Sequence, residues 1–196
     1  MSGFPNRFRL RTLKFAFLFP GPDDPWINRV VAKVSKHPVC HVELVFEDDM
    51  SFSIFQGSEL FFKPRTFSNP EYRILAINVS GPEYFGARAF CEGAVKQNLG
   101  FTDVGMVGAC MQPRNCAVCC YKPSEETGYT FCSKIITEAL QAGKLPEVEG
   151  LHPCTTSPSN LLDVLSESPR RVCDTNSYKM SLVIKNAQVV FVNRIQ

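Results

Sequence analysis

The chain has 196 residues, which is enough for one domain with a proper core but not comfortably for two. Hydrophobic residues make up 44% of the sequence and charged residues 20%, and both fractions are typical of globular proteins. The formal net charge of +2 gives no support, by charge alone, for a nucleic-acid groove or a membrane-surface helix. We therefore expect a single globular domain over residues 1–196 that binds no nucleic acid.

The first part of the chain predicts a strand followed by a helix. Residues 15–19, within a strand expected over residues 13–19, form an apolar run that is too short to span a membrane and is followed by no cleavage site. A buried strand in an intracellular, cytoplasmic protein is the expectation. Asp23 or Asp24 can then cap a helix that has Pro25 at its first position. Its apolar residues recur at helical spacing: Trp26, Ile27, Val30, Val31 and Val34.

A hairpin and two further strands are expected next. Residues 39–46 and 51–56 are rich in β-branched and aromatic side chains, and the acidic residues 47–49 between them form the turn. Residues 59–67 and 71–80 are two more strand candidates. Pro64 lies within the first of these and favours an edge strand or a loop, because proline cannot donate to a sheet.

Helices dominate the rest of the sequence. Residues 82–100 predict a helix with Gly100 past its end, residues 101–111 a shorter helix, and residues 111–128 a loop. A helix over residues 127–143 follows, and then a short one with Ser157 as its cap and Pro158 at its first position. Residues 179–195 predict one or two strands. The fold class is therefore α+β, with a mainly antiparallel sheet and helices packed beside it.

The cysteine content favours reduced thiols. The sequence contains nine cysteines, an odd number, and no signal peptide is visible, so a disulfide framework is not expected. The segment 110–120 holds the one cluster, in which Cys116 and Cys119 have the C-x-x-C spacing of a zinc site. Cys110 and Cys120 could complete the ligand set. The alternative is a loop of small buried thiols, and no cofactor is expected.

Cys132 is the candidate nucleophile. It begins the helix of residues 127–143, two residues after Thr130, which is a suitable N-cap. A thiol at the positive end of a helix is stabilised as the thiolate, which would lower its pKa. The free N–H groups of the same turn, that of Cys132 included, can hold a developing oxyanion. Taken alone, Cys132 is also well explained as a small core residue.

A base must come from one of three histidines. His37 and His152 each precede a proline in a loop, whereas His41 lies near the start of a predicted strand. Strand alternation places His41 on the same face as Glu43 and opposite Val42. A histidine in that position is costly to bury without a partner. A structural histidine with satisfied hydrogen bonds remains the alternative.

Four segments, in order, resemble a known family. They are "SKHPVCHVELVFEDDMSFSIFQG", "GFTDVGMVG", "YTFCSKIITEAL" and "TTSPSNLLDVL", spread over roughly residues 26 to 166. Together they look like the permuted papain-like branch of the NlpC superfamily, which includes YiiX-type proteins, the lecithin–retinol acyltransferase group and relatives in large DNA viruses. In that branch a histidine opens a strand and the nucleophilic cysteine begins a later helix. The resemblance implies that His41 and Cys132 take these roles.

The third residue of the site is less well matched. YiiX-type proteins have a glutamate in the strand after the histidine, and Gln56 stands nearest that place. A two-residue turn would pair Gln56 with His41, whereas a three-residue turn would favour Ser53. Glu43 lies on the right face as well. We take Gln56 as the expected third residue, because a neutral amide can orient an imidazole.

The resemblance implies a cysteine peptidase, amidase or acyltransferase. Cys132 would attack an amide, peptide or lipid ester bond and form a thioester, while His41 transfers the proton. The loop 111–128 would border the substrate cleft. If the protein is viral, as some relatives are, it would act in the host cytoplasm. The alternatives are a non-catalytic binding module with the same fold and a zinc-stabilised protein built around Cys110–Cys120.

Overall fold

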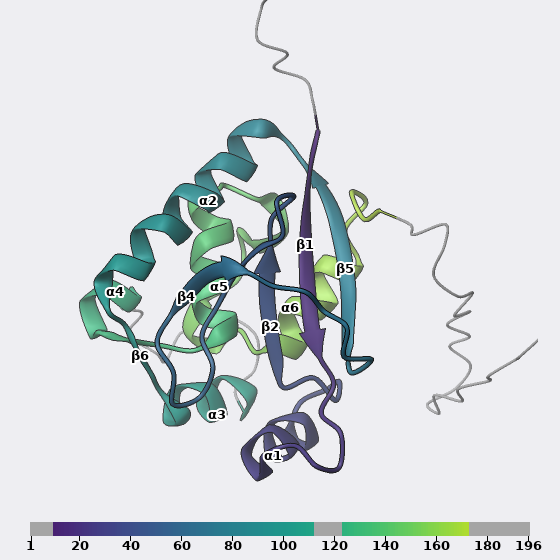
Figure 1. The fold of residues 1–196 in the computed structure, drawn as a ribbon, viewed down its shortest axis with the longest axis vertical. Helices are drawn as coiled ribbons and strands as arrows, with labels where there is room; N and C mark the ends of the chain where they lie inside the picture. Colours follow the sequence, from purple (N-terminus) through teal and green to yellow (C-terminus); the bar gives the residue numbers. More distant parts are fainter. Residues whose placement is uncertain (1–9, 112–122, 173–196) are drawn as a thin grey trace, which may run out of the picture.

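The computed structural model describes residues 10–111 and 123–172. Five antiparallel strands form one sheet in the order β4-β3-β2-β1-β5 (Figure 1). They are β1 (Arg11–Leu18), β2 (His41–Val45), β3 (Met50–Ser53), β4 (Phe61–Pro64) and β5 (Tyr72–Val79). The predicted α+β class is therefore confirmed. Pro64 ends the edge strand β4, where its missing N–H costs no sheet hydrogen bond, as the sequence predicted.

Helices account for most of the remaining structure. They are α1 (Trp26–Val34), α2 (Gly81–Ala94), α3 (Asp103–Met111), α4 (Ser124–Thr127), α5 (Cys132–Ala142) and α6 (Pro158–Ser166), with 3-10 turns η1 (Val95–Gln97), η2 (Pro146–Val148) and η3 (Pro153–Thr155). A two-stranded parallel sheet joins β6 (Gly100–Phe101) to β7 (Tyr129–Thr130). None of the helices in the described ranges is long and apolar enough to cross a membrane.

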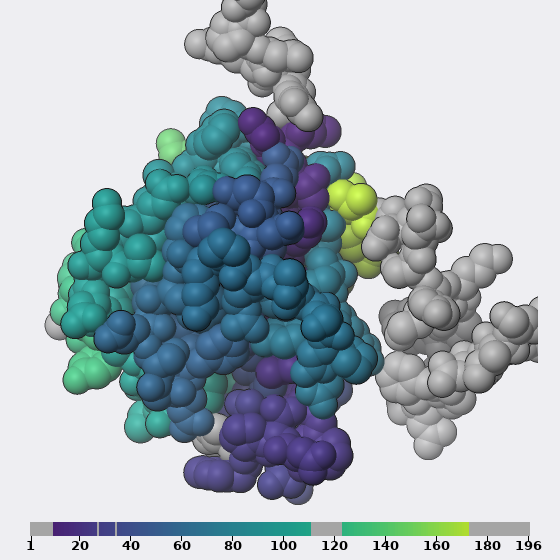
Figure 2. Space-filling view, viewed as in Figure 1, coloured from purple at the N-terminus to yellow at the C-terminus, as the bar shows by residue number. Residues whose placement is uncertain are grey.

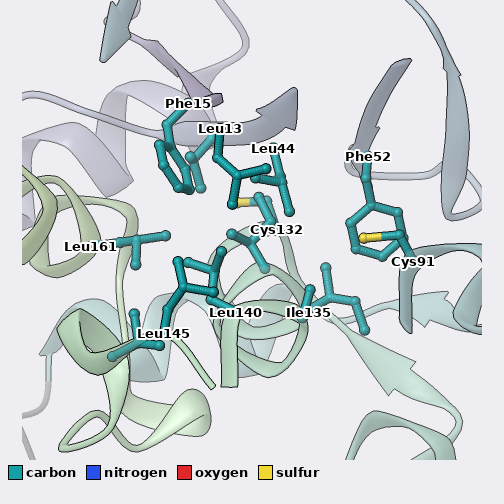
Figure 3. Close-up of a cluster of buried hydrophobic side chains, with 14 of the residues drawn as sticks. Leu13, Phe15, Leu44, Phe52, Cys91, Cys132, Ile135, Leu140, Leu145 and Leu161 are labelled. Atoms are coloured by element: carbon teal, nitrogen blue, oxygen red, sulfur yellow. The ribbon is translucent and has the colours of Figure 1, made fainter. Parts of the chain in front are cut away.

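The core lies between the sheet and helices α2, α5 and α6, which cover one face of it (Figure 1). Phe15 of β1 and Leu44 of β2 point into this core and belong to the same buried cluster as Ile135 of α5 (Figure 3). The helix α5 is central, because nine of its eleven residues are buried, Cys132 among them. Helices α2 and α5 also approach closely. A Cβ at Gly143 would lie 2.5 Å from the carbonyl oxygen of Glu83, so this approach requires glycine.

The β2–β3 hairpin has a three-residue loop. Phe46 N–H donates to Met50 O at 2.9 Å, which leaves residues 47–49 outside the pair. Asp49 takes a left-handed conformation with φ 58°, as the last residue of such loops commonly does. The resulting register pairs Leu44 with Phe52 and Val45 with Ser51. Continued along the strands, it places Phe55 beside His41, so the expected pairing of Gln56 with His41 is not observed.

The second face of the sheet is covered by the chain between β3 and β5. This segment, residues 54–71, crosses in front of β1 and β2 in the view of Figure 1 and covers part of the sheet in Figure 2. Phe55 stacks on His41 and Arg65 pairs with Glu43, so the covering segment contacts β2 directly. Tyr72, the first residue of β5, adds a hydrogen bond to Glu43. Both faces of β2 are therefore buried, which explains why all five of its residues are inaccessible.

Several helix ends differ from the sequence predictions. The N-cap of α5 is Phe131, because Thr130 belongs to β7 and hydrogen-bonds Ser124 instead. Helix α1 begins at Trp26, one residue later than expected, so Pro25 is its N-cap and neither Asp23 nor Asp24 caps the helix. Helix α2 ends at Ala94 and passes through η1 to a left-handed Asn98, so Gly100 is free to begin β6. The predicted Ser157 cap of α6 is confirmed, since its side chain accepts from Asn160 N–H.

Three predictions concern segments that are only partly described. The strands expected over residues 179–195 lie outside the described residues. The loop expected over residues 111–128 is described from Pro123 onward, where it contains the short helix α4. Cys116, Cys119 and Cys120 of the proposed zinc cluster also lie outside the described ranges.

Candidate functional site

The site is built around the first residues of β2. His41 begins the strand and Glu43 follows two residues later, so their side chains share one face of the sheet. His41 Nε2 lies 3.8 Å from Glu43 Oε1, and both side chains are buried. The sequence therefore provides an adjacent imidazole and carboxylate by strand alternation alone.

Glu43 is held by three further polar groups. Its carboxylate accepts hydrogen bonds from Ser51 Oγ at 2.7 Å and from Tyr72 OH at 3.0 Å, and Arg65 Nε lies 3.2 Å away. Burial raises the pKa of Glu43, while Ser51, Arg65 and Tyr72 act in the opposite direction. Burial and the neighbouring Glu43 in turn raise the pKa of the Tyr72 phenol. A fully buried carboxyl group with this many partners is held in a fixed orientation.

An aromatic stack closes the site. The rings of His41 and Phe55 are stacked at 4.3 Å, and Phe61 stacks on Phe55 at 5.5 Å. The guanidinium of Arg65 lies 5.2 Å from the centroid of the Phe55 ring. Burial, together with the positive charge of Arg65, lowers the pKa of His41 to about 3. The imidazole is therefore neutral at physiological pH, and its buried Nε2 has no hydrogen-bond partner among the described residues.

Gln56 and Ser53 make other contacts. Gln56 is exposed, and its side-chain amide donates to Asp103 Oδ1 of α3 at 2.7 Å. Ser53 is buried and donates to the carbonyl oxygen of Val42 at 2.7 Å. The three-residue loop of the hairpin shifts the register away from the one that would place Gln56 at His41. The same register, continued along the strands, sets Ser53 opposite Glu43, so the expectation that such a loop would bring Ser53 to His41 is wrong. Of the polar residues considered for the third position, Glu43 is the one that lies beside the ring.

Cys132 is the first residue of α5 and lies against β2. Its side chain belongs to the main hydrophobic cluster, close to Leu44 and Leu13 (Figure 3). Burial raises the pKa of the thiol to about 12, although hydrogen bonds from the backbone of Val42 and Ser133 partly oppose this shift. The lower thiol pKa expected at a helix N-terminus is thus not observed, because desolvation has the larger effect. The described conformation holds a neutral, inaccessible thiol.

The side chains of Cys132 and His41 lie on different sides of the start of β2. His41 belongs to this strand, and Cys132 packs against it from α5. The backbone of Val42, the residue that follows His41, lies close enough to Cys132 to lower the pKa of its thiol, against the larger effect of burial. The side chain of Val42 points into the core with Cys132, however, so strand alternation places the His41 ring on the other face. Within the described part of the chain, no hydrogen bond joins the thiol to the imidazole. Cys132 therefore lies beside the strand that carries His41, but the two side chains do not form a catalytic pair.

The described thiols form no disulfide and no metal site. None of Cys40, Cys91, Cys110, Cys132 and Cys154 takes part in a disulfide. Across residues 10–111 and 123–172, no group of three or more histidine, cysteine or acidic residues is arranged to hold a metal ion. Cys110 belongs to the proposed zinc cluster, whose other members lie outside these ranges.

Two functional side chains were missed by sequence reasoning. Arg65 and Tyr72 complete the polar contacts of Glu43, yet each lies more than twenty residues further along the chain. The sequence signal for them is weak, since only a buried acidic residue in an apolar strand indicates that partners must come from elsewhere.

Comparison of the chain with protein-family models, with curated proteins and with solved structures gives no match.

Proposed function

We propose that the protein is a cysteine-dependent hydrolase or acyltransferase of the permuted papain-like kind, with Cys132 as nucleophile and His41 as base. The observation that supports this most is the meeting of α5 with β2. Helix α5 begins with Cys132 and packs against β2, and the backbone of Val42, next to His41 in that strand, acts on the pKa of the Cys132 thiol. A thiol at a helix start thus lies beside the stretch of β2 that carries an imidazole at His41 and a carboxylate at Glu43.

The reaction would use these groups in the usual order for a cysteine enzyme. The Cys132 sulfur attacks a carbonyl carbon, and its proton passes to His41. The N–H groups in the first turn of α5 have no intrahelical acceptors and would hold the oxyanion. His41 then gives the proton to the leaving amine or alcohol, which leaves a thioester on Cys132. Water or an amine attacks this thioester and regenerates the thiol.

Glu43 would replace Gln56 as the third residue. A carboxylate 3.8 Å from the imidazole stabilises the imidazolium that forms during the reaction better than a neutral amide would. Its hydrogen bonds from Ser51 and Tyr72 fix its orientation. Glu43 is therefore a positioning residue, which acts on the substrate through His41.

The proposal requires a conformational change at His41. In the described structure the thiol has a pKa of about 12 and the imidazole a pKa of about 3, so proton transfer between them is unfavourable. The buried, unpartnered Nε2 costs roughly 1–3 kcal/mol, which a move of the ring toward a donor or acceptor would recover. Release of the Phe55 ring from the imidazole would free it to turn around the end of β2 toward α5.

Turnover of a reactive acyl ester tests the proposal. We expect the full-length protein to hydrolyse 4-nitrophenyl esters, and we expect Cys132→Ala and His41→Gln each to lower the rate at least about 100-fold. Cys91→Ala is the matched control, because Cys91 is a fully buried thiol in the same core and also has a raised pKa. Equal rates for Cys132→Ala and Cys91→Ala would refute the catalytic role.

The second candidate function is a non-catalytic binding module with the same fold. The burial of both Cys132 and His41, on different faces of β2, favours it. In that case the His41–Glu43 pair stabilises the packing of residues 54–71 on the sheet. The module would show no turnover, and substitution of Cys132 would change stability alone.

A further inference from the structure

One face of α1 combines exposed apolar and basic side chains. Trp26 is 67% exposed and Val30 is 37% exposed. Arg29 and Lys33 are exposed as well. Positions 26, 29, 30 and 33 have the i, i+3, i+4 and i+7 spacing that places side chains on a single helix face. The docking face of α1 is defined here as these four residues.

The opposite side of α1 is fixed to the body of the protein. Val31 is fully buried in a cluster with Leu18 and Met106, and α1 contacts α3. The helix lies at the lower edge of the molecule, beyond the ends of β1 and β2, and stands out from the surface (Figures 1 and 2). The docking face is thus presented outward by a helix that is packed on its other side.

The cations of this face differ from those arginines of the described residues that are held in ion pairs. Four arginines have a carboxylate partner, namely Arg11, Arg65, Arg88 and Arg170. Arg29 and Lys33 have no ion-pair partner within the described ranges. Two unpaired cations beside an exposed tryptophan leave both a positive charge and an apolar surface for a partner to satisfy.

We propose that the docking face of α1 binds the surface of a membrane that contains anionic lipids. Tryptophan and valine would enter the interfacial region, where indole rings partition favourably, while Arg29 and Lys33 would contact lipid phosphates. The face is a convex helix surface with one large aromatic side chain, which fits a planar boundary. The small net charge of the whole chain does not oppose this, because the attraction acts within about 10 Å of the surface.

The single tryptophan of the chain makes the test direct, because its fluorescence reports on this face alone. The full-length protein is mixed with vesicles of phosphatidylcholine, with or without phosphatidylserine, and both emission and co-sedimentation are measured. We expect a blue shift of the emission and co-sedimentation with the phosphatidylserine vesicles, and weakening of both at high salt.

Paired variants separate the docking face from general effects. Lys33→Glu should lower vesicle affinity at least about fivefold, whereas Lys96→Glu, an equal charge change on η1, should leave it unchanged. Trp26→Gln should likewise lower binding, and Phe85→Gln, which removes a half-exposed aromatic ring from α2, should not. Circular dichroism of each variant verifies folding. These surface variants lie outside the proposed catalytic residues, so ester turnover should persist in all of them.

Two results would overturn the proposal. The first is an absence of any blue shift or co-sedimentation with anionic vesicles. The second is binding that Lys33→Glu and Lys96→Glu weaken equally, which would assign it to general charge. A blue shift with soluble polyglutamate that exceeds the shift with anionic vesicles would assign the face to an acidic protein partner instead, and would also contradict the membrane proposal.

Discussion

The imidazole of His41 lies 3.8 Å from the carboxylate of Glu43, on a strand that is buried on both faces. Glu43 accepts hydrogen bonds from two hydroxyl groups and lies beside Arg65, whereas Nε2 of His41 has no hydrogen-bond partner within the described residues. The carboxylate is therefore fixed in place. The imidazole ring beside it is not held by a hydrogen bond at Nε2, so it is the group that can gain one by moving. This asymmetry is what the proposed function uses.

Removal of the Glu43 carboxylate should destabilise the fold. Glu43→Ala leaves the Ser51 and Tyr72 hydroxyls without their acceptor and Arg65 without its partner, so we expect a loss of roughly 3 kcal/mol in the free energy of unfolding. Urea denaturation measures it. Glu59→Ala, on an exposed carboxylate, is the control and should stay within about 0.5 kcal/mol. Similar losses for the two variants would show that the buried contacts of Glu43 contribute no stability.

Protonation of His41 should make stability depend on pH. Its pKa is 6.5 when unperturbed and about 3 in the fold, so between these values the unfolded chain binds a proton that the native state does not. Stability is therefore lost as pH falls from 6.5 toward 3, by up to about 1 kcal/mol per pH unit. The raised pKa of Glu43 acts in the opposite direction and is present in both wild type and His41→Gln.

Comparison of wild type with His41→Gln isolates the contribution of His41 to the pH dependence of stability. Denaturation of wild type and His41→Gln at pH 7, 6 and 5 should show a steeper loss of stability for wild type. Parallel curves would contradict the burial of a neutral imidazole.

Local patterns predicted the elements well, and long-range contacts were harder to predict. Strand alternation gave the common face of His41 and Glu43, and Ser157 with Pro158 gave the start of α6. The register of the hairpin depended on one residue in its loop, Asp49, whose left-handed conformation the sequence does not specify. Arg65 and Tyr72, two of the partners of Glu43, come from the chain beyond β4, and the burial of Cys132 results from the packing of α5 against β2 and β3. Neither follows from spacing along the chain.

Asp49 should be sensitive to side-chain branching at Cβ. Its φ of 58° is in the left-handed region, which glycine adopts freely and which β-branched residues strongly disfavour. We expect Asp49→Val to cost about 1–2 kcal/mol and Asp49→Gly to be neutral or slightly stabilising. Chemical denaturation compares them. Equal stabilities of the two variants would mean that this loop does not fix the register that places Phe55 on His41.

Gly143 and Gly93 should respond oppositely to alanine. A Cβ at Gly143 would lie 2.5 Å from Glu83 O and would force α2 and α5 apart, at a cost of about 1–3 kcal/mol. A Cβ at Gly93, within α2, meets nothing within 4 Å, so Gly93→Ala should gain up to about 1 kcal/mol from helix propensity. Thermal unfolding of both variants tests the close helix approach. A stabilising Gly143→Ala would contradict it.

The central claim, that Cys132 is a nucleophile served by His41, is tested most directly by mapping an acyl-enzyme. The full-length protein is treated briefly with 4-nitrophenyl acetate, quenched in acid and analysed by peptide mass spectrometry. The account predicts acetylation at Cys132, with a yield at least about tenfold lower in His41→Gln and unchanged in Cys154→Ser. Acetylation spread over the partly accessible Cys110 and Cys154, with Cys132 unmodified and His41→Gln without effect, would contradict it.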